Sequence, residues 1–187
     1  MRIVLASQSP RRQALLKELG YDFIVDPSLN DEVFDFTLSI DEALKNVAHQ
    51  KAKDVQTRHS KDIVIASDTI VYFQGKVLGK PKSEQDAKMM LQELSGNTHQ
   101  VKTAVCILRN QDRIDFVCTS DVTFHKLTDE QIEHYIHEKK PFDKAGSYGI
   151  QECDFVKTYT GEFTNIVGLP QEACKRIFQT EVDPYIK

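Results

Sequence analysis

The sequence predicts a mixed α/β fold in which one sheet is wrapped by helices. Short apolar runs that favour strands alternate with amphipathic segments that carry helix-capping residues. The alternation lacks the regular strand–helix rhythm of a dinucleotide-binding domain, and no internal repeat or linker rich in proline, glycine and serine divides it. The 187 residues suffice for one conventional core, so we expect a single domain over residues 1–187.

Strands and helices follow one another from these local signals. Strands are expected at residues 2–7, 23–25, 63–66, 70–73, 101–108 and 116–124. Helices are expected at residues 10–19, 40–58, 83–94, 128–137 and about 171–178. The strand segments are rich in β-branched residues, and the helical segments repeat apolar residues at a period near 3.6. The polar segment 27–38 is expected to be a loop.

Capping residues and turns set the ends of these elements. Pro10 suits the first position of a helix, and Gly20 suits the turn that follows its last residue. Ser39 and Thr128 each stand three residues before a glutamate or a glutamine, which is the spacing of a capping box. Residues 74–76 are expected to turn the preceding strand back on itself.

The composition excludes several classes of protein. Hydrophobic residues make up 40% and charged residues 28%, which excludes a disordered or collagen-like chain. With 24 basic and 28 acidic residues the net charge is −4, which disfavours binding to nucleic acid through phosphates. No apolar stretch near the N-terminus is long enough for a signal segment or a membrane span. We therefore expect a cytoplasmic protein without a membrane or nucleic-acid partner, whose four cysteines are reduced thiols.

Asp68 is the most informative candidate for a functional residue. It interrupts an uncharged run, residues 63–71, that otherwise has the pattern of a buried strand. A carboxylate in such a place must be hydrogen-bonded, paired or metal-bound, because burying a bare charge is unfavourable. Two interpretations are open: a structural aspartate that caps a turn, or a general base or Mg²⁺ ligand at a strand end facing a pocket.

A candidate anion site lies where the first strand breaks into the first helix. Free backbone N–H groups at a helix start, together with Ser7, Ser9, Arg11 and Arg12, are suited to bind a phosphate. The alternative is that Ser9 only caps the helix and both arginines are solvated. The local pattern favours neither interpretation over the other.

Two further segments place glycines beside polar residues. Residues 75–81 resemble a P-loop superficially, but the glycines are one residue too close and a proline replaces the serine or threonine. Lys80 in this segment is still suited to bind a phosphate as a point charge. In residues 142–151, two glycines permit tight turns, and Lys144 and Gln151 could supply charge and an amide to read a base edge. Turn formation alone would explain the glycines equally well.

Taken in order, these segments resemble the Maf family of nucleoside triphosphate pyrophosphatases. The resemblance covers nearly the whole chain and rests on the motifs LASQSPRRQALL, QKAKDV, ASDTIV, GKPKSEQDA, LSGNTHQVKTAV, DKAGSYGIQ and NIVGLP. It implies an elongated mixed sheet wrapped by helices, similar to that of inosine triphosphatases, with two lobes in a single domain. It also implies a hydrolase that depends on a divalent metal, Mg²⁺ or alternatively Mn²⁺. Such an enzyme cuts the α–β phosphoanhydride to release the monophosphate and pyrophosphate.

The resemblance also implies roles for individual residues. It makes Asp68 the catalytic carboxylate and a metal ligand together with Glu32, with Asp31 as the alternative to Glu32. The polar and basic residues that match the family's pocket are Ser7, Arg12, Lys51 and Lys80. The residues that match the positions distinguishing the branch for dTTP, UTP and related pyrimidine nucleotides are Arg11, Thr69 and Gln151.

A function of a different class is also open. Because the Maf family has been associated with septum formation, the chain could be a nucleotide-binding regulatory module in cell division. That alternative predicts nucleotide binding without metal-dependent hydrolysis. The resemblance to the family is also compatible with a homodimer.

Overall fold

The computed structural model describes residues 1–186, which divide into two compact units. The first unit comprises Met1–Asp68, Thr103–Cys118 and the segment from Gly168 onward. The second unit comprises Thr69–Lys102 and Thr119–Val167. Neither unit is continuous in sequence, so each one is assembled from separate stretches of the chain.

The strands form a mixed sheet in the order β2-β1-β3-β5-β6-β7, with β4 paired to β3. Their bounds are β1 (Ile3–Leu5), β2 (Phe23–Val25), β3 (Ile63–Phe73), β4 (Lys76–Leu78), β5 (Thr98–Arg109), β6 (Asp112–Phe124) and β7 (Val156–Thr160). β1 is parallel to both β2 and β3, whereas β4 is antiparallel to β3 and β7 is antiparallel to β6. The predicted mixed α/β class is therefore confirmed.

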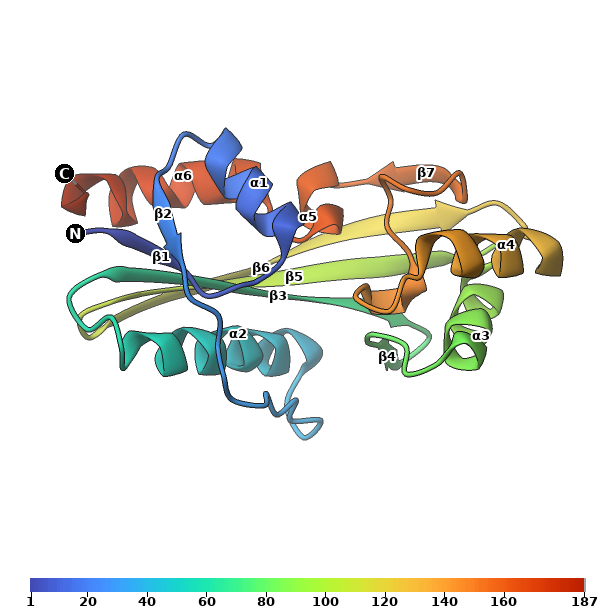
Figure 1. The fold of residues 1–187 in the computed structure, drawn as a ribbon, viewed down its shortest axis with the longest axis horizontal. Coiled ribbons are helices and arrows are strands. Elements are labelled where there is room, and N and C mark those ends of the chain that lie inside the picture. Colours follow the sequence, from blue (N-terminus) through green and yellow to red (C-terminus); the bar gives the residue numbers. More distant parts are fainter. Residues whose placement is uncertain (187) are drawn as a thin grey trace. The chain divides into compact units, whose positions relative to one another are not determined.

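Three helices cover the strands of the first unit. α1 (Pro10–Glu18) and α6 (Gln171–Glu181) lie on one side of the strands, and α2 (Ile40–Gln56) lies on the other (Figure 1). Ser9 and Ser39 cap α1 and α2, because each side-chain hydroxyl accepts a backbone N–H three residues further along. The buried face of α2 consists of Ala43, Leu44, Val47, Ala48, Ala52 and Val55.

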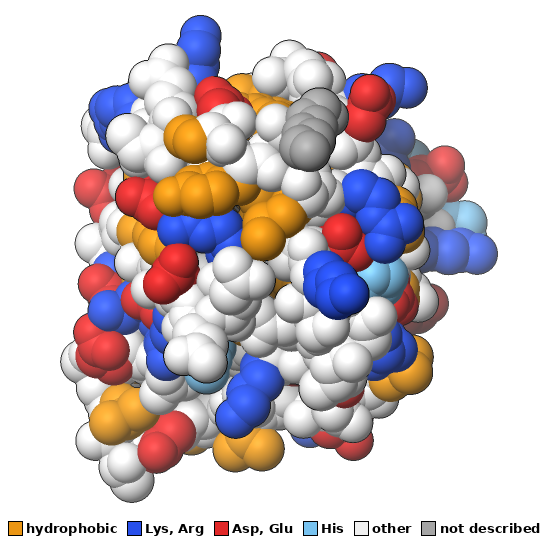
Figure 2. Space-filling model, turned by 90° about the vertical axis from the view of Figure 1, so that its left-hand side faces the viewer, with side chains coloured by type: hydrophobic (Ala, Val, Ile, Leu, Met, Phe, Trp, Pro, Cys, Tyr) orange, Lys and Arg blue, Asp and Glu red, His pale blue; other side chains and the backbone are white. Residues whose placement is uncertain are grey.

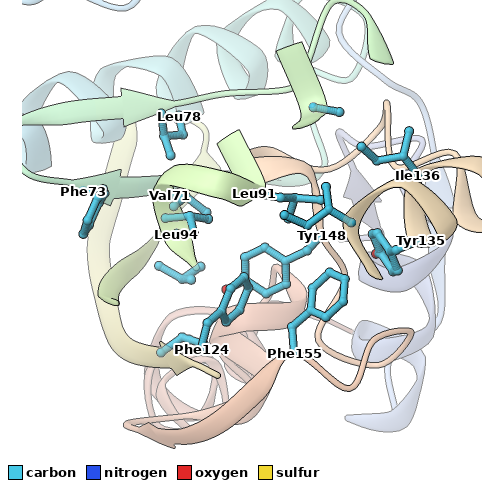
Figure 3. Close-up of a cluster of buried hydrophobic side chains, with 14 residues drawn as sticks. Val71, Phe73, Leu78, Leu91, Leu94, Phe124, Tyr135, Ile136, Tyr148 and Phe155 are labelled. Carbon is cyan, nitrogen blue, oxygen red and sulfur yellow. The ribbon is translucent and has the colours of Figure 1, made fainter. Parts of the chain in front are cut away.

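The second unit contains α3 (Glu84–Leu94), α4 (Asp129–Lys139), the 3-10 turn η1 (Ala145–Ser147) and α5 (Phe163–Val167). Thr128 caps α4 in a complete capping box, as expected from its spacing. The core of this unit combines aliphatic side chains with a group of aromatic rings (Figure 3). Its larger members are Val71, Phe73, Leu78, Leu91, Leu94, Phe124, Tyr135, Ile136, Tyr148 and Phe155.

The bounds of several strands differ from the expectation, and β1 is shorter than the expected residues 2–7. β3 runs without a break from Ile63 to Phe73, so Asp68 lies within the strand instead of interrupting it. A strand is held by backbone hydrogen bonds, which a polar side chain does not remove. β5 and β6 are longer than expected and are joined by Asn110 and Gln111 alone. Asn110 has φ 54°, a left-handed conformation that asparagine tolerates and that suits a two-residue turn.

The cysteines are free thiols, as expected. Burial raises the pKa of Cys106 to about 12 and the pKa of Cys153 to about 11. Both thiols are therefore protonated and unreactive at neutral pH. Among residues 1–186, no helix combines the length and the apolar character that crossing a membrane requires.

The N-terminus contacts the C-terminal segment of the first unit. The Met1 ammonium donates a hydrogen bond to the Tyr185 carbonyl at 2.6 Å. Figure 2 shows the side of the molecule on which the N-terminus lies, where basic and acidic side chains are intermingled.

His99 is a buried titratable residue in the core of the second unit. Only 2% of it is exposed, and its Nε2 lies 2.7 Å from the Tyr148 hydroxyl. Its ring meets Phe124 edge-on. Burial lowers the pKa of His99 to about 4, although the Asp121 carboxylate opposes this shift. His99 is therefore neutral at neutral pH.

We expect acid to destabilise the protein through His99. Its pKa is about 4 in the folded state and near 6.5 in a solvated reference, so the unfolded chain binds the proton first as the pH falls. The free energy of unfolding should therefore fall between these two pH values, by roughly 3 kcal/mol from this group. Urea denaturation at several pH values measures the effect. His99→Gln should lose less stability over the same interval.

His137→Gln is the matched control, because His137 lies exposed on α4. This variant should keep the acid sensitivity of the wild type. If His99→Gln loses as much stability as the wild type on acidification, the effect does not come from His99.

Candidate active site

The first unit brings a carboxylate of the central strand into contact with an ammonium of α2. The side chain of Asp68, in β3, is 21% exposed, and that of Lys51, in α2, is 14% exposed. Asp68 Oδ1 and Lys51 Nζ are 2.5 Å apart. This charge-assisted hydrogen bond offsets the desolvation of both groups. The idea that Asp68 caps a turn is wrong, and so is its expected place at a strand end, because it lies in the middle of a continuous strand.

A second carboxylate reaches the same ammonium. Glu32 Oε1 lies 3.4 Å from Lys51 Nζ, so Lys51 bridges Glu32 and Asp68. Glu32 belongs to the predicted loop between β2 and α2, whereas Asp68 belongs to the sheet. Two acids far apart in sequence thus face one cationic group.

Helix α2 also holds the loop that carries Glu32. The Gln50 side chain exchanges two hydrogen bonds with the backbone of Val33, both at 3.0 Å. One turn further along α2, the Asp54 carboxylate accepts the backbone N–H of Leu29 at 2.9 Å. The roles of Gln50 and Asp54 were not predicted from the sequence, because a polar residue on a helix carries no local signal for the loop beside it.

The start of α1 is joined to the C-terminal segment through Arg12. Its Nε donates to the Gly168 carbonyl at 3.0 Å, and its Nη1 lies 3.4 Å from Ser7 Oγ. Ser67 Oγ donates to the same carbonyl at 3.2 Å. Gly168 has φ 126°, a conformation that favours glycine. Ser67 and Gly168 had no predicted role, although the NIVGLP and ASDTIV motifs contain them.

Burial and the neighbouring charges both shift the pKa of Arg12. Arg12 is partly exposed, yet the packing around its guanidinium lowers its pKa; Asp68 and Glu32 oppose this shift, and Arg11 adds to it. Arginine nevertheless stays protonated in proteins. In the alternative interpretation, Ser9 caps the helix and both arginines are solvated. The Ser9 cap is confirmed. Arg12, however, is hydrogen-bonded to protein acceptors.

Comparison with known proteins identifies the family. The family model described as Maf-like protein matches residues 2–181. This chain belongs to the Maf family. A Halalkalibacterium halodurans protein named dTTP/UTP pyrophosphatase is 46% identical over 170 residues, which cover 90% of each chain. A Bacillus pumilus protein of the same name is 42% identical over 181 residues, which cover 96% of each chain.

Two further matches come from a relative and from a solved structure. A dTTP/UTP pyrophosphatase of Carboxydothermus hydrogenoformans is 43% identical over 175 residues, covering 91% of this chain and 93% of its own. The structure of the Staphylococcus aureus Ham1 protein has a TM-score of 0.47 at 17% identity, covering 66% of this chain and 72% of that one.

The residues predicted from the Maf resemblance fall into two sets. Those in the first unit are Ser7, Arg11, Arg12, Glu32, Lys51 and Asp68. Those in the second unit are Thr69, Lys80 and Gln151. Thr69 is half-buried in β3, whereas Lys80 and Gln151 are exposed in the segments after β4 and after η1. The Gly146 N–H donates to the Gly79 carbonyl at 3.0 Å, which ties the segment of Lys80 to the one that leads to Gln151.

Lys144 has a structural role in this Maf chain. It is 8% exposed, and its Nζ lies 2.8 Å from Asp143 Oδ1 and 3.2 Å from Glu152 Oε2. Its ammonium neutralises two carboxylates of its own segment. Gln151, which is exposed, is therefore better placed than Lys144 to contact a ligand.

Gly146→Ala should destabilise the segment that leads to Gln151. Gly146 has φ 66°, and a Cβ there would lie 2.7 Å from Val71 Cγ2, so the segment or the strand must shift. We expect a loss of about 2–4 kcal/mol in the free energy of unfolding, measured by urea denaturation. Gly20→Ala is the control, because Gly20 has φ 90° but a Cβ there meets no described atom within 4 Å. It should cost about 1 kcal/mol, and equal losses would contradict the steric argument.

Proposed function

We propose that this chain hydrolyses dTTP and UTP, together with modified pyrimidine nucleotides of the same class, to the nucleoside monophosphate and pyrophosphate. The observation that carries the proposal is the extent of the likeness. Relatives named dTTP/UTP pyrophosphatase are 42% and 46% identical to the chain over 96% and 90% of its length. The charged groups of the first unit support the same class of reaction.

The basic residues suit a triphosphate substrate. A nucleoside triphosphate carries about four negative charges, and phosphoryl transfer depends mainly on positioning and on neutralising that charge. We assign Arg12, Lys51 and Lys80 to the phosphates. Ser7, beside the start of α1, supplies a hydroxyl where helix N–H groups also favour an anion. The residues assigned to substrate preference are Arg11, Thr69 and Gln151.

The two acids around Lys51 fit a divalent cation. Mg²⁺ is commonly held by one or two carboxylates, by substrate phosphates and by water. Asp68 and Glu32 already face a single cationic group from two different segments. Within residues 1–186 no cluster of three or more histidine, cysteine or acidic side chains is arranged to hold a metal. Because their carboxylates meet at one ammonium, we assign Asp68 and Glu32 as ligands of Mg²⁺, or alternatively Mn²⁺, which when bound would neutralise phosphate charge.

Asp68 is also the residue that we assign to the attacking water. Its carboxylate orients the water or takes its proton while the water oxygen bonds to the α-phosphorus. The bond from the α-phosphorus to the bridging oxygen breaks, and pyrophosphate leaves with that oxygen. Lys51, hydrogen-bonded to Asp68 Oδ1, keeps the carboxylate in one orientation.

Pyrophosphate release from a panel of nucleoside triphosphates, with Mg²⁺ and with EDTA, tests the proposal. We expect metal-dependent release from dTTP and UTP together with the matching monophosphate. Asp68→Asn should lower kcat/KM by about 10²- to 10⁴-fold, because the amide cannot accept the proton. The variant keeps an oxygen for Lys51, and Glu32 still compensates the ammonium, so its circular dichroism spectrum should remain that of a folded protein.

Asp112→Asn is the matched control for the loss of one carboxylate charge. Asp112 also forms an ion pair, with Arg109 at 2.8 Å, but has no proposed part in the site. Its turnover should equal that of the wild type. Full turnover in Asp68→Asn would exclude both roles of Asp68. Nucleotide binding by a folded protein that releases no pyrophosphate would instead favour the regulatory module.

Gln151→Glu should change the preference among bases more than the affinity for phosphates. A carboxylate accepts hydrogen bonds but cannot donate them as the amide does, so the ranking of dTTP, UTP, CTP and GTP should change. Inhibition by added pyrophosphate reports phosphate affinity separately. Gln56→Glu adds the same charge at an exposed hydrogen-bonded position and serves as the control. An unchanged ranking in Gln151→Glu would defeat the assignment.

A further inference from the structure

Gln151 sits at the tip of a short turn. The Glu152 N–H donates to the Gly149 carbonyl at 2.9 Å, and this bond closes a turn with Ile150 and Gln151 at its two central positions. Gln151 is exposed, whereas Phe155, four residues later, is 2% exposed. The turn therefore presents Gln151 outward from a segment whose far end is anchored in the core.

One tyrosine of α4 contacts both ends of this segment. Tyr135 accepts the Gly149 N–H through its hydroxyl oxygen at 3.0 Å. Its ring centroid lies 4.8 Å from that of Phe155. Figure 3 shows both rings within the hydrophobic cluster. Gly149 and Phe155 flank Gln151, so a single side chain spans the turn that carries it.

Helix α4 gives Tyr135 a fixed position. Tyr135 is 5% exposed, and its neighbours Ile132 and Ile136 are buried on the same face of the helix. A buried phenol needs a partner for its hydroxyl, because burial of an unpaired polar group is unfavourable. The Gly149 N–H is that partner. A phenylalanine at position 135 would fill the same space but could not accept this N–H.

The segment is also anchored immediately before the turn. The Tyr148 hydroxyl lies 2.7 Å from His99 Nε2, and the Tyr148 ring packs edge-on against Phe124 at 4.8 Å. Tyr148 thus fixes where the segment leaves the core. Tyr135 then fixes the turn itself.

We propose that Tyr135 is a positioning residue for base recognition, which holds the turn from Gly149 to Glu152 so that Gln151 meets the base in one geometry. This role rests on the proposed function, in which Gln151 contributes to substrate preference. A misplacement of a recognition group by about 1 Å is enough to weaken a specific contact. The hydroxyl of Tyr135 therefore acts on specificity without touching the substrate.

Tyr135→Phe tests the proposal with two independent measurements. Hydrogen–deuterium exchange, read by mass spectrometry, should be faster in the peptide that contains residues 149–155. In steady-state pyrophosphate release, the KM for dTTP and UTP should rise about 3- to 10-fold while kcat changes less than about 2-fold. The preference for dTTP and UTP over CTP and GTP should shrink accordingly.

Tyr21→Phe is the matched control. It also removes a phenol hydroxyl that makes a hydrogen bond, to Asp183 at 2.6 Å, but it does so in the first unit. It should cost comparable thermal stability and leave both the exchange of residues 149–155 and the nucleotide preference unchanged. A shift in preference in both variants would mean that lost stability, not the position of the turn, causes the effect.

The remaining outcomes separate this inference from the proposed function. Unchanged exchange of residues 149–155 in Tyr135→Phe would overturn the anchoring role. Faster exchange with an unchanged nucleotide preference would overturn the role in specificity. If the wild type hydrolyses no nucleotide, the proposed function fails and the role in specificity fails with it, while the exchange experiment still decides whether Tyr135 anchors the turn.

Discussion

The half-buried carboxylate of Asp68 constrains the arrangement of the first unit. The residues that precede it in β3, from Ile63 to Ser67, are buried, and an unpaired charge beside them would be strongly unfavourable. The Lys51 ammonium supplies the compensating charge, with its Nζ 2.5 Å from Asp68 Oδ1. Helix α2 must therefore pack with the turn that carries Lys51 against β3. The same helix holds the loop of Glu32, so one ion pair ties together a strand, a helix and a loop.

Stability alone gives no reason for such a pair. Replacing a buried ion pair with well-packed apolar residues is often neutral or stabilising, whereas removing one partner leaves an uncompensated charge. Apolar residues at both positions, 68 in β3 and 51 in α2, would avoid this cost. The pair of Asp68 and Lys51 is therefore not the choice that stability alone would favour. Such departures are expected at functional sites.

The second unit handles its polar groups in a different way. Its aromatic core contains Tyr135, Tyr148 and His99. The Tyr148 hydroxyl pairs with His99 Nε2, and the Tyr135 hydroxyl accepts the Gly149 N–H. These bonds anchor the segment between η1 and β7 while Gln151 stays exposed. A rigid core thus supports the residue that we propose for base recognition, just as an ion pair on packed elements supports the carboxylate that we propose for catalysis in the first unit.

Short-range signals in the sequence determined much of the fold. The Ser9, Ser39 and Thr128 caps act within three residues of themselves, so each could be predicted without knowing the rest of the structure. Asp68 stood out for a similar reason, since a charge within an apolar run is visible locally. The boundaries of β3 were less predictable, because its hydrogen bonds come from other strands and the polarity of Asp68 does not interrupt them.

The contacts that build the site depend on tertiary packing. Arg12 and Gly168 are 156 positions apart, and Lys51 and Asp68 are 17 apart on different kinds of element. The bond from Gly149 to Tyr135 likewise joins a turn to a helix. No local pattern encodes such pairs, because they depend on how helices pack against strands after each element has formed. The sequence alone therefore identified candidate functional residues, whereas only the packing of the folded chain determined which residues hold them in place.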